Sequence, residues 1–476
     1  LFEKTLDWSG STADYFALLG RKPDGSPDPD GKILVDPHNL IDYMLGIFYT
    51  GSNDEAAAWG GRSTNNFFCM VDHDEPAGFQ FFRHDAEHSM DVGWEDRTAP
   101  ATDAKFRRLE WFNGQTLHER LSKNEEYRLL FADHVQRHLF HNGAMTPANS
   151  IKQMKRRVAE VERAIPVEAA RWGNTTNESP TQWRRNADYL LKNWLPVRRD
   201  KVVRQLQRRG LYPELAPPMV LSDGSPISRK VWQVAGEGTF SLKHEEVGEG
   251  QIHYTLDGSD PRAIGGGVSV AAKKGAAGNP IKIEGVVLKA RTKSGDHWSA
   301  LREVFFVRPI AKSALQISEI QYHTYDDQTG DRKTPEERFE FVETRNRSDS
   351  TIALTGVALT EGVYFQFPDG AVIKPGEHVA VAADPKAFKR RYGFSPVGKY
   401  LRSLSNGGET VTLSDVMGNE IDSVTYLDKA PWPSEADGSG RTLSRVDTKP
   451  SSEAGGVSEW RVSPQKDGTP GRKNTF

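Results

Sequence analysis

The sequence predicts a multidomain α+β protein, in which a mainly helical region is followed by two all-β, immunoglobulin-like sandwiches. Helix-length runs fill the chain up to about residue 215, where the proline-rich stretch YPELAPP ends their periodicity. Beyond it, short runs alternate apolar and polar residues between glycine turns, which is typical of sandwiches. The length of 476 residues, 37% of them hydrophobic, suffices for about three domains.

Charge argues against two classes of partner. A formal net charge of −3 and a sequence pI near 6.5 give no general attraction for nucleic acids or membranes. The basic run Arg198–Arg209 is predicted to be the solvated face of an amphipathic helix, with Val202 and Leu206 turned inward. It has no base-reading motif, so no nucleic-acid role is expected. The sequence also lacks an apolar run of membrane-spanning length, so no membrane span is expected.

The N-terminal 90 residues hold the first candidate site. After a predicted helix at Ser11–Leu19 and a turn-rich loop, Asp36-Pro37 is a typical start for the apolar helix that follows. That helix leads to Asp54 in a loop. Asn65 and Asn66 then precede an aromatic segment.

A strand-like run at Phe79–Phe82 follows, and beyond its end lie Asp85, Glu87 and His88. Carboxylates and amides gathered at the ends of apolar elements suit a Mg²⁺–phosphate site, because Mg²⁺ prefers hard oxygen ligands. The alternative is that these residues only cap helices and form turns. Cys69, the single cysteine, lies in the apolar run NNFFCMV and is expected to be buried.

Further helices are predicted from periodicity and capping residues, at Lys105–Asn113, Glu125–Leu139, Pro147–Ala170 and Pro180–Arg209. His134 and His138 share the i, i+4 spacing of one helix face, and His141 lies nearby. Without a glutamate in the H-E-x-x-H pattern, packing along the helix bundle is favoured over metal binding.

Strands of the first sandwich are predicted at Phe240–His244, Gln251–Leu256, Ile281–Thr292 and Leu301–Val307, with a tight turn at Asp257-Gly258. The last third of the chain also alternates apolar and polar residues, with turns between the runs. Its acidic residues supply oxygen ligands that would suit Ca²⁺, the alternative being solvated loops and strand ends. These residues are Glu319, Glu340, Glu343, Asp326, Asp327 and Asp331.

Several segments of the first 215 residues together resemble the CotH family of atypical secreted kinases. They are NLIDYMLGIFYTGSNDEAAAW, NNFF, FFRHDAEHSM, EAARWG and NWLPVRRDKVVRQLQRRGLYP. The resemblance implies Mg²⁺–ATP phosphoryl transfer to a protein hydroxyl. It implies that Asp54 serves the acceptor hydroxyl, that Asp85 binds Mg²⁺, and that Asn65 or Asn66 assists with metal or phosphate.

The same resemblance implies a second lobe. Kinases of this kind grip the ATP phosphates with a Lys and a Glu from an N-terminal β-rich lobe. Lys4, Lys22 and Lys32 have no strand context of that kind, and Leu1 is not a start methionine. We therefore expect this chain to derive from a longer protein and to be inactive alone, with the missing lobe supplied by another segment or chain.

Two further resemblances complete the expected domain order. IHYTLDGSDPR and the following GVVLKARTKSGDHWSALREVFF resemble the chitobiase/β-hexosaminidase C-terminal domain, and an exposed Trp298 there would suit sugar binding. FEFVETRNRSDSTIALTGVALT and later segments resemble the lamin-tail domain. The expected domains are residues 1–215, 216–310 and 311–476. These modules imply export to the cell surface or extracellular space. The alternative function is a non-catalytic binding protein for a surface polymer or protein.

Overall fold

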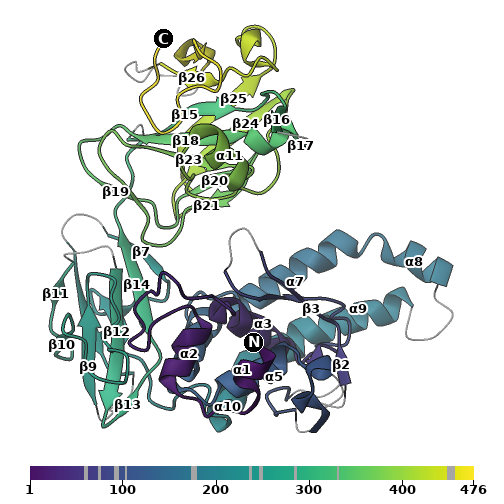
Figure 1. Ribbon diagram of the computed structural model, residues 1–476, viewed down its shortest axis with the longest axis vertical. Helices are drawn as coiled ribbons and strands as arrows, with labels where there is room; N and C mark the ends of the chain where they lie inside the picture. Colours follow the sequence, from purple (N-terminus) through teal and green to yellow (C-terminus); the bar gives the residue numbers. More distant parts are fainter. Residues whose placement is uncertain are drawn as a thin grey trace.

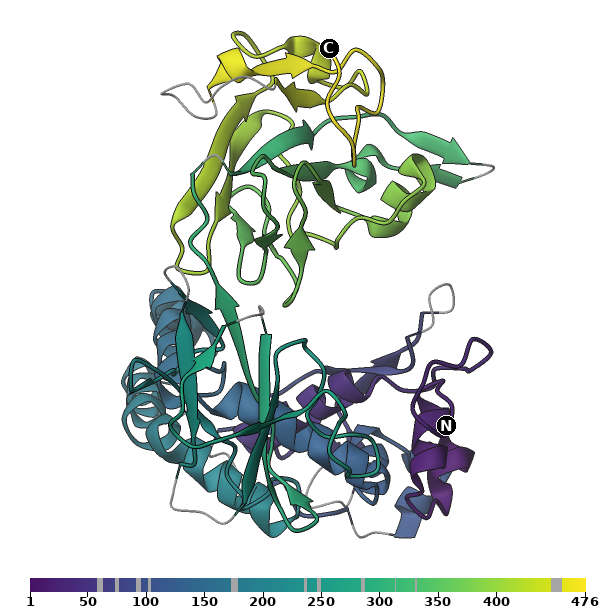
Figure 2. The ribbon, with the colours of Figure 1, turned by 90° about the vertical axis from the view of Figure 1, so that its left-hand side faces the viewer.

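The computed structural model describes residues 1–57, 63–72, 77–90, 96–101, 104–172, 179–234, 238–245, 250–283, 287–312, 314–329, 332–446 and 456–476. Figure 1 shows a helical region beside a first β-sandwich, with a second β-sandwich at the other end of the long axis, and Figure 2 shows the same arrangement from the side. The predicted fold class is confirmed. In the described residues, no helix combines the length and the apolar character that crossing a membrane requires.

The helical region is built around α3 (Pro37–Thr50), whose apolar side chains are almost completely buried. Leu40, Met44, Ile47 and Phe48 pack in one core with residues of α5 and α6. The other helices are α1 (Phe2–Leu6), α2 (Thr12–Leu18), α5 (Gly114–Leu121), α6 (Glu125–Leu139), α7 (Pro147–Val161), α8 (Ile165–Trp172), α9 (Pro180–Tyr189) and α10 (Leu195–Arg208). Two short antiparallel pairs accompany them, β1 (Ala56–Ala57) with β2 (Ser63–Asn65) and β3 (Phe67–Met70) with β4 (Gln80–Arg83).

Prolines divide two of the predicted helices. The run predicted as Pro147–Ala170 forms α7 and α8, because Pro166 at the start of α8 has no N–H for a continuous helix. The run Pro180–Arg209 contains a π-helical turn, η3 (Leu190–Trp194), which ends two residues before Pro196. Helix α6 matches its prediction to the residue.

The helix predicted at Lys105–Asn113 is wrong. The segment forms two short 3₁₀ turns, η1 (Ala104–Arg107) and η2 (Leu109–Trp111), because Arg108 between them has an extended backbone. Asn113 instead caps α5, a helix that sequence reasoning did not assign, through a capping box with Thr116.

The first sandwich encloses its own core, with Leu242, Ile252, Leu288 and Val304 at its centre. One sheet has the order β10-β9-β12-β14-β7, with β13 paired to β12, and the other has the order β11-β8-β5-β6. The strands are β5 (Met219–Ser222), β6 (Ser225–Pro226), β7 (Val231–Gln233), β8 (Thr239–Lys243), β9 (Gln251–Thr255), β10 (Lys273–Gly275), β11 (Ile281–Lys282), β12 (Val287–Ser294), β13 (His297–Trp298) and β14 (Arg302–Val307).

Three predictions about single features are corrected. The run Ile281–Thr292 is split between β11 and β12, which lie in different sheets. Trp298 is buried at 5% exposure, and its Nε1 donates a hydrogen bond to the Gly266 carbonyl. Cys69 is exposed, since β3 and β4 form a two-stranded sheet whose outer positions face solvent.

The Asp257-Gly258 turn is present, but it is not the end of a two-residue hairpin. The Asp257 carboxylate accepts a hydrogen bond from the Ser259 N–H at 2.9 Å, which is an Asx turn. The chain then runs through a long loop before β10.

The second sandwich has sheets of order β23-β18-β15-β26-β27 and β21-β20-β24-β25. Short pairs β16–β17 and β19–β22, the helix α11 (Pro385–Tyr392), and the 3₁₀ turns η4 (Glu336–Phe339), η5 (Ser434–Ala436) and η6 (Val457–Glu459) complete it. The strands are β15 (Leu315–Gln321), β16 (Asp327–Thr329), β17 (Arg332–Thr334), β18 (Phe341–Asn346), β19 (Ile352–Ala353), β20 (Ala358–Thr360), β21 (Phe365–Gln366), β22 (Val372–Ile373), β23 (His378–Ala382), β24 (Gly408–Ser414), β25 (Glu420–Leu427), β26 (Leu443–Arg445) and β27 (Trp460–Val462).

Candidate functional site: the Asp54 loop

The Asp54 loop, residues 52–55, follows directly from the end of α3. Asp36 caps the start of this helix by accepting hydrogen bonds from the His38 and Asn39 N–H groups, as the sequence predicts. Gly51 ends it in the left-handed conformation at φ 65°, where a residue without Cβ is favoured. The chain then turns inward, so Asp54 is only 8% exposed.

Asn65 and Asn66 both contact Asp54. The Asn65 Nδ2 donates to Asp54 Oδ1 at 2.8 Å, and the Asn66 Nδ2 donates to Asp54 Oδ2 at 3.0 Å. The β1–β2 pairing brings Asn65 close to Asp54, because Ala56 lies opposite Asn65. Each oxygen of the carboxylate therefore has its own amide partner, and the orientation of the group is fixed.

The segment after β4 returns to the same loop. The Asn53 N–H donates to the His88 carbonyl at 2.8 Å, and the Met90 N–H donates to the Thr50 carbonyl at 2.7 Å. These bonds bring the side chains of Glu87 and His88 to Asp54, with one ligand atom of each within 4.8 Å of the others. Two carboxylates and an imidazole are suitable ligands for a divalent cation, and the carboxylates for Mg²⁺ in particular.

Asp85 occupies a different position. It is exposed, has a left-handed backbone at φ 55°, and its carbonyl accepts a hydrogen bond from Asn66 Nδ2 at 3.4 Å. Its carboxylate is not among the metal-capable groups gathered around Asp54 in the described residues. Asp85 as the metal ligand stays a prediction, as do the roles of Asp54, Asn65 and Asn66.

A buried ion pair that sequence reasoning missed supports the loop. Glu55 is completely buried beside Asp54, and Arg83 from β4 donates to it through Nε at 2.8 Å and through Nη2. Arg83 Nη2 also donates to Thr50 Oγ1 at 3.1 Å. Arg83 thus joins β4 to both the end of α3 and the Asp54 loop.

Two further side chains form hydrogen bonds with the backbone near the Asp54 loop and in β4. Arg97 is 3% exposed and donates through Nε to the Ser52 carbonyl and through Nη2 to the Ala57 carbonyl at 2.8 Å. Asn39 accepts from the Phe81 N–H at 2.6 Å and donates to the Phe81 carbonyl at 3.2 Å, which anchors β4 on α3. Asn39 and Arg83 adjoin apolar runs, which is a weak sequence signal, whereas Arg97 lies in a polar segment that gives none.

The three lysines considered for phosphate binding lie outside strands. Lys4 is on α1, and Lys22 and Lys32 are in the turn-rich loop after α2.

Three of the acidic residues considered for Ca²⁺ accept hydrogen bonds from protein groups. Glu319 accepts hydrogen bonds from the Thr469 N–H and from Thr442, while Glu343 accepts from Ser318 and the Gly471 N–H. Glu340 accepts from Tyr400 Oη at 3.0 Å. The Asp327 side chain and Asp331 lie outside the described parts, so Ca²⁺ binding stays a prediction.

Two protein-family models match parts of the chain. Residues 22–202 match the family model for CotH kinase protein. The match includes Asp54, Asn65, Asn66 and Asp85, and it makes this part of the chain, here the CotH region, a kinase-like scaffold. Residues 308–428, here the lamin-tail region, match the family model for the Lamin Tail Domain. The boundaries predicted for the three domains stay predictions.

Similarity to individual solved structures is low. No curated protein matches the chain significantly. A solved DUF4876 family protein from Bacteroides thetaiotaomicron is 11% identical over 49% of this chain and 90% of its own, with a TM-score of 0.23. A protein of unknown function from Porphyromonas gingivalis is 13% identical over 44% of this chain and 98% of its own, with a TM-score of 0.13. TM-scores this low carry no structural argument.

Proposed function

We propose that the CotH region is the part of an exported protein kinase that transfers a phosphoryl group from Mg²⁺–ATP to a protein hydroxyl. One observation carries the proposal: Asp54, at the end of the central helix, is held by paired amides with Glu87 and His88 within reach. Phosphoryl transfer depends mainly on positioning and charge stabilisation, and a carboxylate fixed in this way meets the first requirement.

In this proposal, Asp54 accepts the proton of the acceptor hydroxyl, whose oxygen bonds to the γ-phosphorus as the bond to the ADP oxygen breaks. Asn65 and Asn66 keep the carboxylate oriented and assist with metal or phosphate. Asp85 or Glu87 supplies oxygen ligands for Mg²⁺, which when bound would neutralise phosphate charge. The Lys and Glu that grip ATP in such kinases would come from a further lobe, supplied by another segment or chain.

The remaining regions are proposed to serve as accessory modules. Residues 216–310 form a sandwich that we propose to be a chitobiase C-terminal-like spacer, and the lamin-tail region is proposed to bind a partner at the cell surface or in the extracellular space. The buried position of Trp298 removes the residue first considered for sugar binding.

The experiment is Mg²⁺–ATP calorimetry on this chain, alone and within any longer polypeptide that contains it, with Asp85→Asn, Glu87→Gln and Asp54→Asn variants. We expect Asp85→Asn or Glu87→Gln to weaken nucleotide binding at least tenfold, which decides between the two ligands. Asp54→Asn should keep binding and lose phosphoryl transfer. Asp296→Asn, at an exposed hairpin tip, is the matched control. Unchanged binding in both ligand variants would overturn the site.

A second candidate function is a non-catalytic surface or matrix binding protein that uses the CotH region as a scaffold. It is favoured by the burial of Asp54 and by the amide partner on each of its oxygens, since such bonds also suit a purely structural carboxylate. This function predicts no nucleotide binding by any form, together with binding of the intact chain to cell-envelope material.

A further inference from the structure

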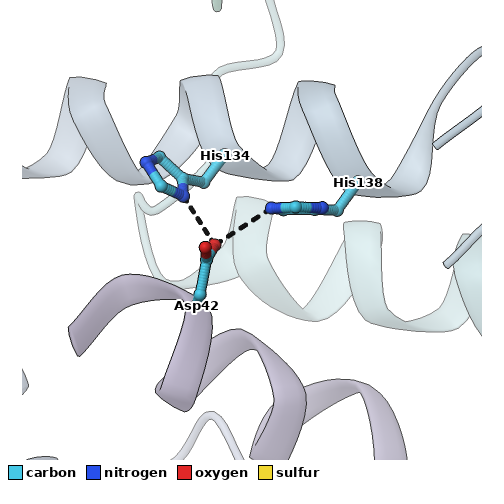
Figure 3. Close-up of side chains that lie close together, drawn as sticks. All are labelled: Asp42, His134 and His138. Carbon is cyan, nitrogen blue, oxygen red and sulfur yellow. Dashed lines mark hydrogen bonds and ion pairs between the residues drawn. The ribbon is translucent and has the colours of Figure 1, made fainter. Parts of the chain in front are cut away.

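A second group of metal-capable side chains lies between α3 and α6. Figure 3 shows Asp42 on α3 facing His134 and His138 on α6. Asp42 Oδ1 lies 2.6 Å from His134 Nδ1 and 3.0 Å from His138 Nε2. One ligand atom from each residue lies within 4.8 Å of the other two. This group is separate from Asp54, Glu87 and His88.

The helix geometry presents the two imidazoles together. His134 and His138 are four residues apart on α6, so they lie on one face in consecutive turns. Nitrogen and oxygen ligands about 2.0–2.1 Å from a tetrahedral Zn²⁺ are about 3.3 Å from one another. The observed distances of 2.6 and 3.0 Å from Asp42 Oδ1 would need to widen by only about 0.3–0.7 Å.

A fourth side chain fixes the buried imidazole. His134 is 1% exposed, and its Nε2 lies 2.9 Å from Nδ1 of His38, in the first turn of α3. A neutral His38 ring can accept a hydrogen bond at Nδ1 from the Nε2–H of His134. Metal-binding histidines commonly donate their second N–H to such a partner, which sets the tautomer and the ring orientation. His38 therefore leaves Nδ1 of His134 directed at Asp42.

The charge and the exposure of the group also suit a cation. The Asp42 carboxylate and the two imidazoles face one point. The Asp42 and His138 side chains are 48% and 25% exposed, so an ion has access from solvent.

We propose that Asp42, His134 and His138 bind a divalent transition-metal ion of the zinc class, with solvent as the fourth ligand. The ion would link α3 to α6, and α3 is the helix that ends at the Asp54 loop. The inference goes beyond the proposed function and does not depend on it.

Titration of the metal-free chain with Co²⁺ tests the proposal, because a tetrahedral Co²⁺ site absorbs visible light strongly. We expect one equivalent of Co²⁺ to give this spectrum and Zn²⁺ to displace it. Asp42→Ala and His138→Ala should each weaken binding at least tenfold. One control should bind as wild type: His297→Ala, at an exposed hairpin.

Two further measurements distinguish a loss of metal binding from a loss of folding. Zn²⁺ should raise the Tm of the wild-type chain and not that of Asp42→Ala, because a ligand that binds only the folded state stabilises it. In the wild type, Zn²⁺ should shift the ¹⁵N resonances of His134 Nδ1 and His138 Nε2. Binding of equal affinity in wild type, Asp42→Ala and His138→Ala, or no binding up to millimolar metal, would overturn the proposal and leave a hydrogen-bonded cluster.

Discussion

At the residue scale, neighbouring acidic side chains have opposite surroundings. Asp54 is held by two neutral amides at the edge of the core, whereas Glu55 is completely buried against the cationic Arg83. A buried carboxylate without a cation carries a desolvation cost of several kcal/mol, so Arg83 is required for Glu55 to be tolerated there. The same pair fixes the direction in which Asp54 points, because the two residues are adjacent in the chain.

Replacing Arg83 by Met should therefore destabilise the helical region by about 3 kcal/mol, since Glu55 would remain buried without its partner. The double change Arg83→Met and Glu55→Gln should recover more than half of that loss. Thermal unfolding and hydrogen exchange of α3 peptides would measure both. Arg108→Ala, at an exposed side chain, serves as the control. A double variant no more stable than Arg83→Met would contradict the pairing argument.

At the element scale, strands of the second sandwich carry carboxylates into its interior. Glu340 stands at the entry to β18, is 2% exposed, and accepts hydrogen bonds from Tyr400 Oη at 3.0 Å and the Leu404 N–H at 2.9 Å. Burial raises the pKa of Glu340 to about 7, despite the opposing effect of these donors. The folded state thus holds this proton over a pH range in which an unfolded chain releases it.

Because the folded pKa is the higher one, the contribution of Glu340 is fully present below the ordinary pKa near 4.5 and is lost as pH rises towards 7. Over this window the free energy of unfolding should fall by up to about 3 kcal/mol. In Glu340→Gln, calorimetric transitions recorded from pH 5 to pH 7 should show a shallower fall than in the wild type. Parallel slopes in the two proteins would show that Glu340 is not the titrating group.

At the scale of the whole molecule, buried arginines join the first sandwich to the helical region. Arg291 on β12 is 1% exposed and donates to both oxygens of Asp133 on α6, at 2.8 and 2.6 Å. It also donates to Asp260 in its own sandwich. Arg262 donates to Glu126 at the start of α6. The second sandwich contacts the N-terminal region through more exposed ion pairs, such as Lys386 with Asp72.

Replacing Arg291 by Met should release the first sandwich from α6, because Asp133 and Asp260 would lose their shared cation. We expect a loss of about 3–5 kcal/mol from this interface. Limited proteolysis near residues 211–218 should then accelerate, and small-angle scattering should show a larger radius of gyration. Lys243→Met, at an exposed side chain on β8, is the matched control. Equal cleavage rates in the two variants would mean that other contacts hold the interface.

The sequence predicted the elements whose signals are local. Capping at Asp36, apolar periodicity through α3 and the limits of α6 all follow from neighbouring residues, so their positions were available before any fold. The alternation of apolar and polar residues over about the last 260 residues similarly predicted the sandwich class. The predicted exposure of a side chain was wrong where it depends on segments distant in the sequence. Cys69 lies on an uncovered two-stranded sheet, and Trp298 lies under a loop.

By itself, the sequence determined the fold class, the order of the regions and the stretch that carries Asp54, Asn65, Asn66 and Asp85. Only the tertiary structure decided that the two amides contact Asp54, that Arg83 and Arg97 hold its loop, and that Asp42 faces His134 and His138. The reason is physical. Periodicity and capping act within one or two turns of chain, whereas each of these contacts joins residues between 11 and 96 positions apart, which only packing brings together.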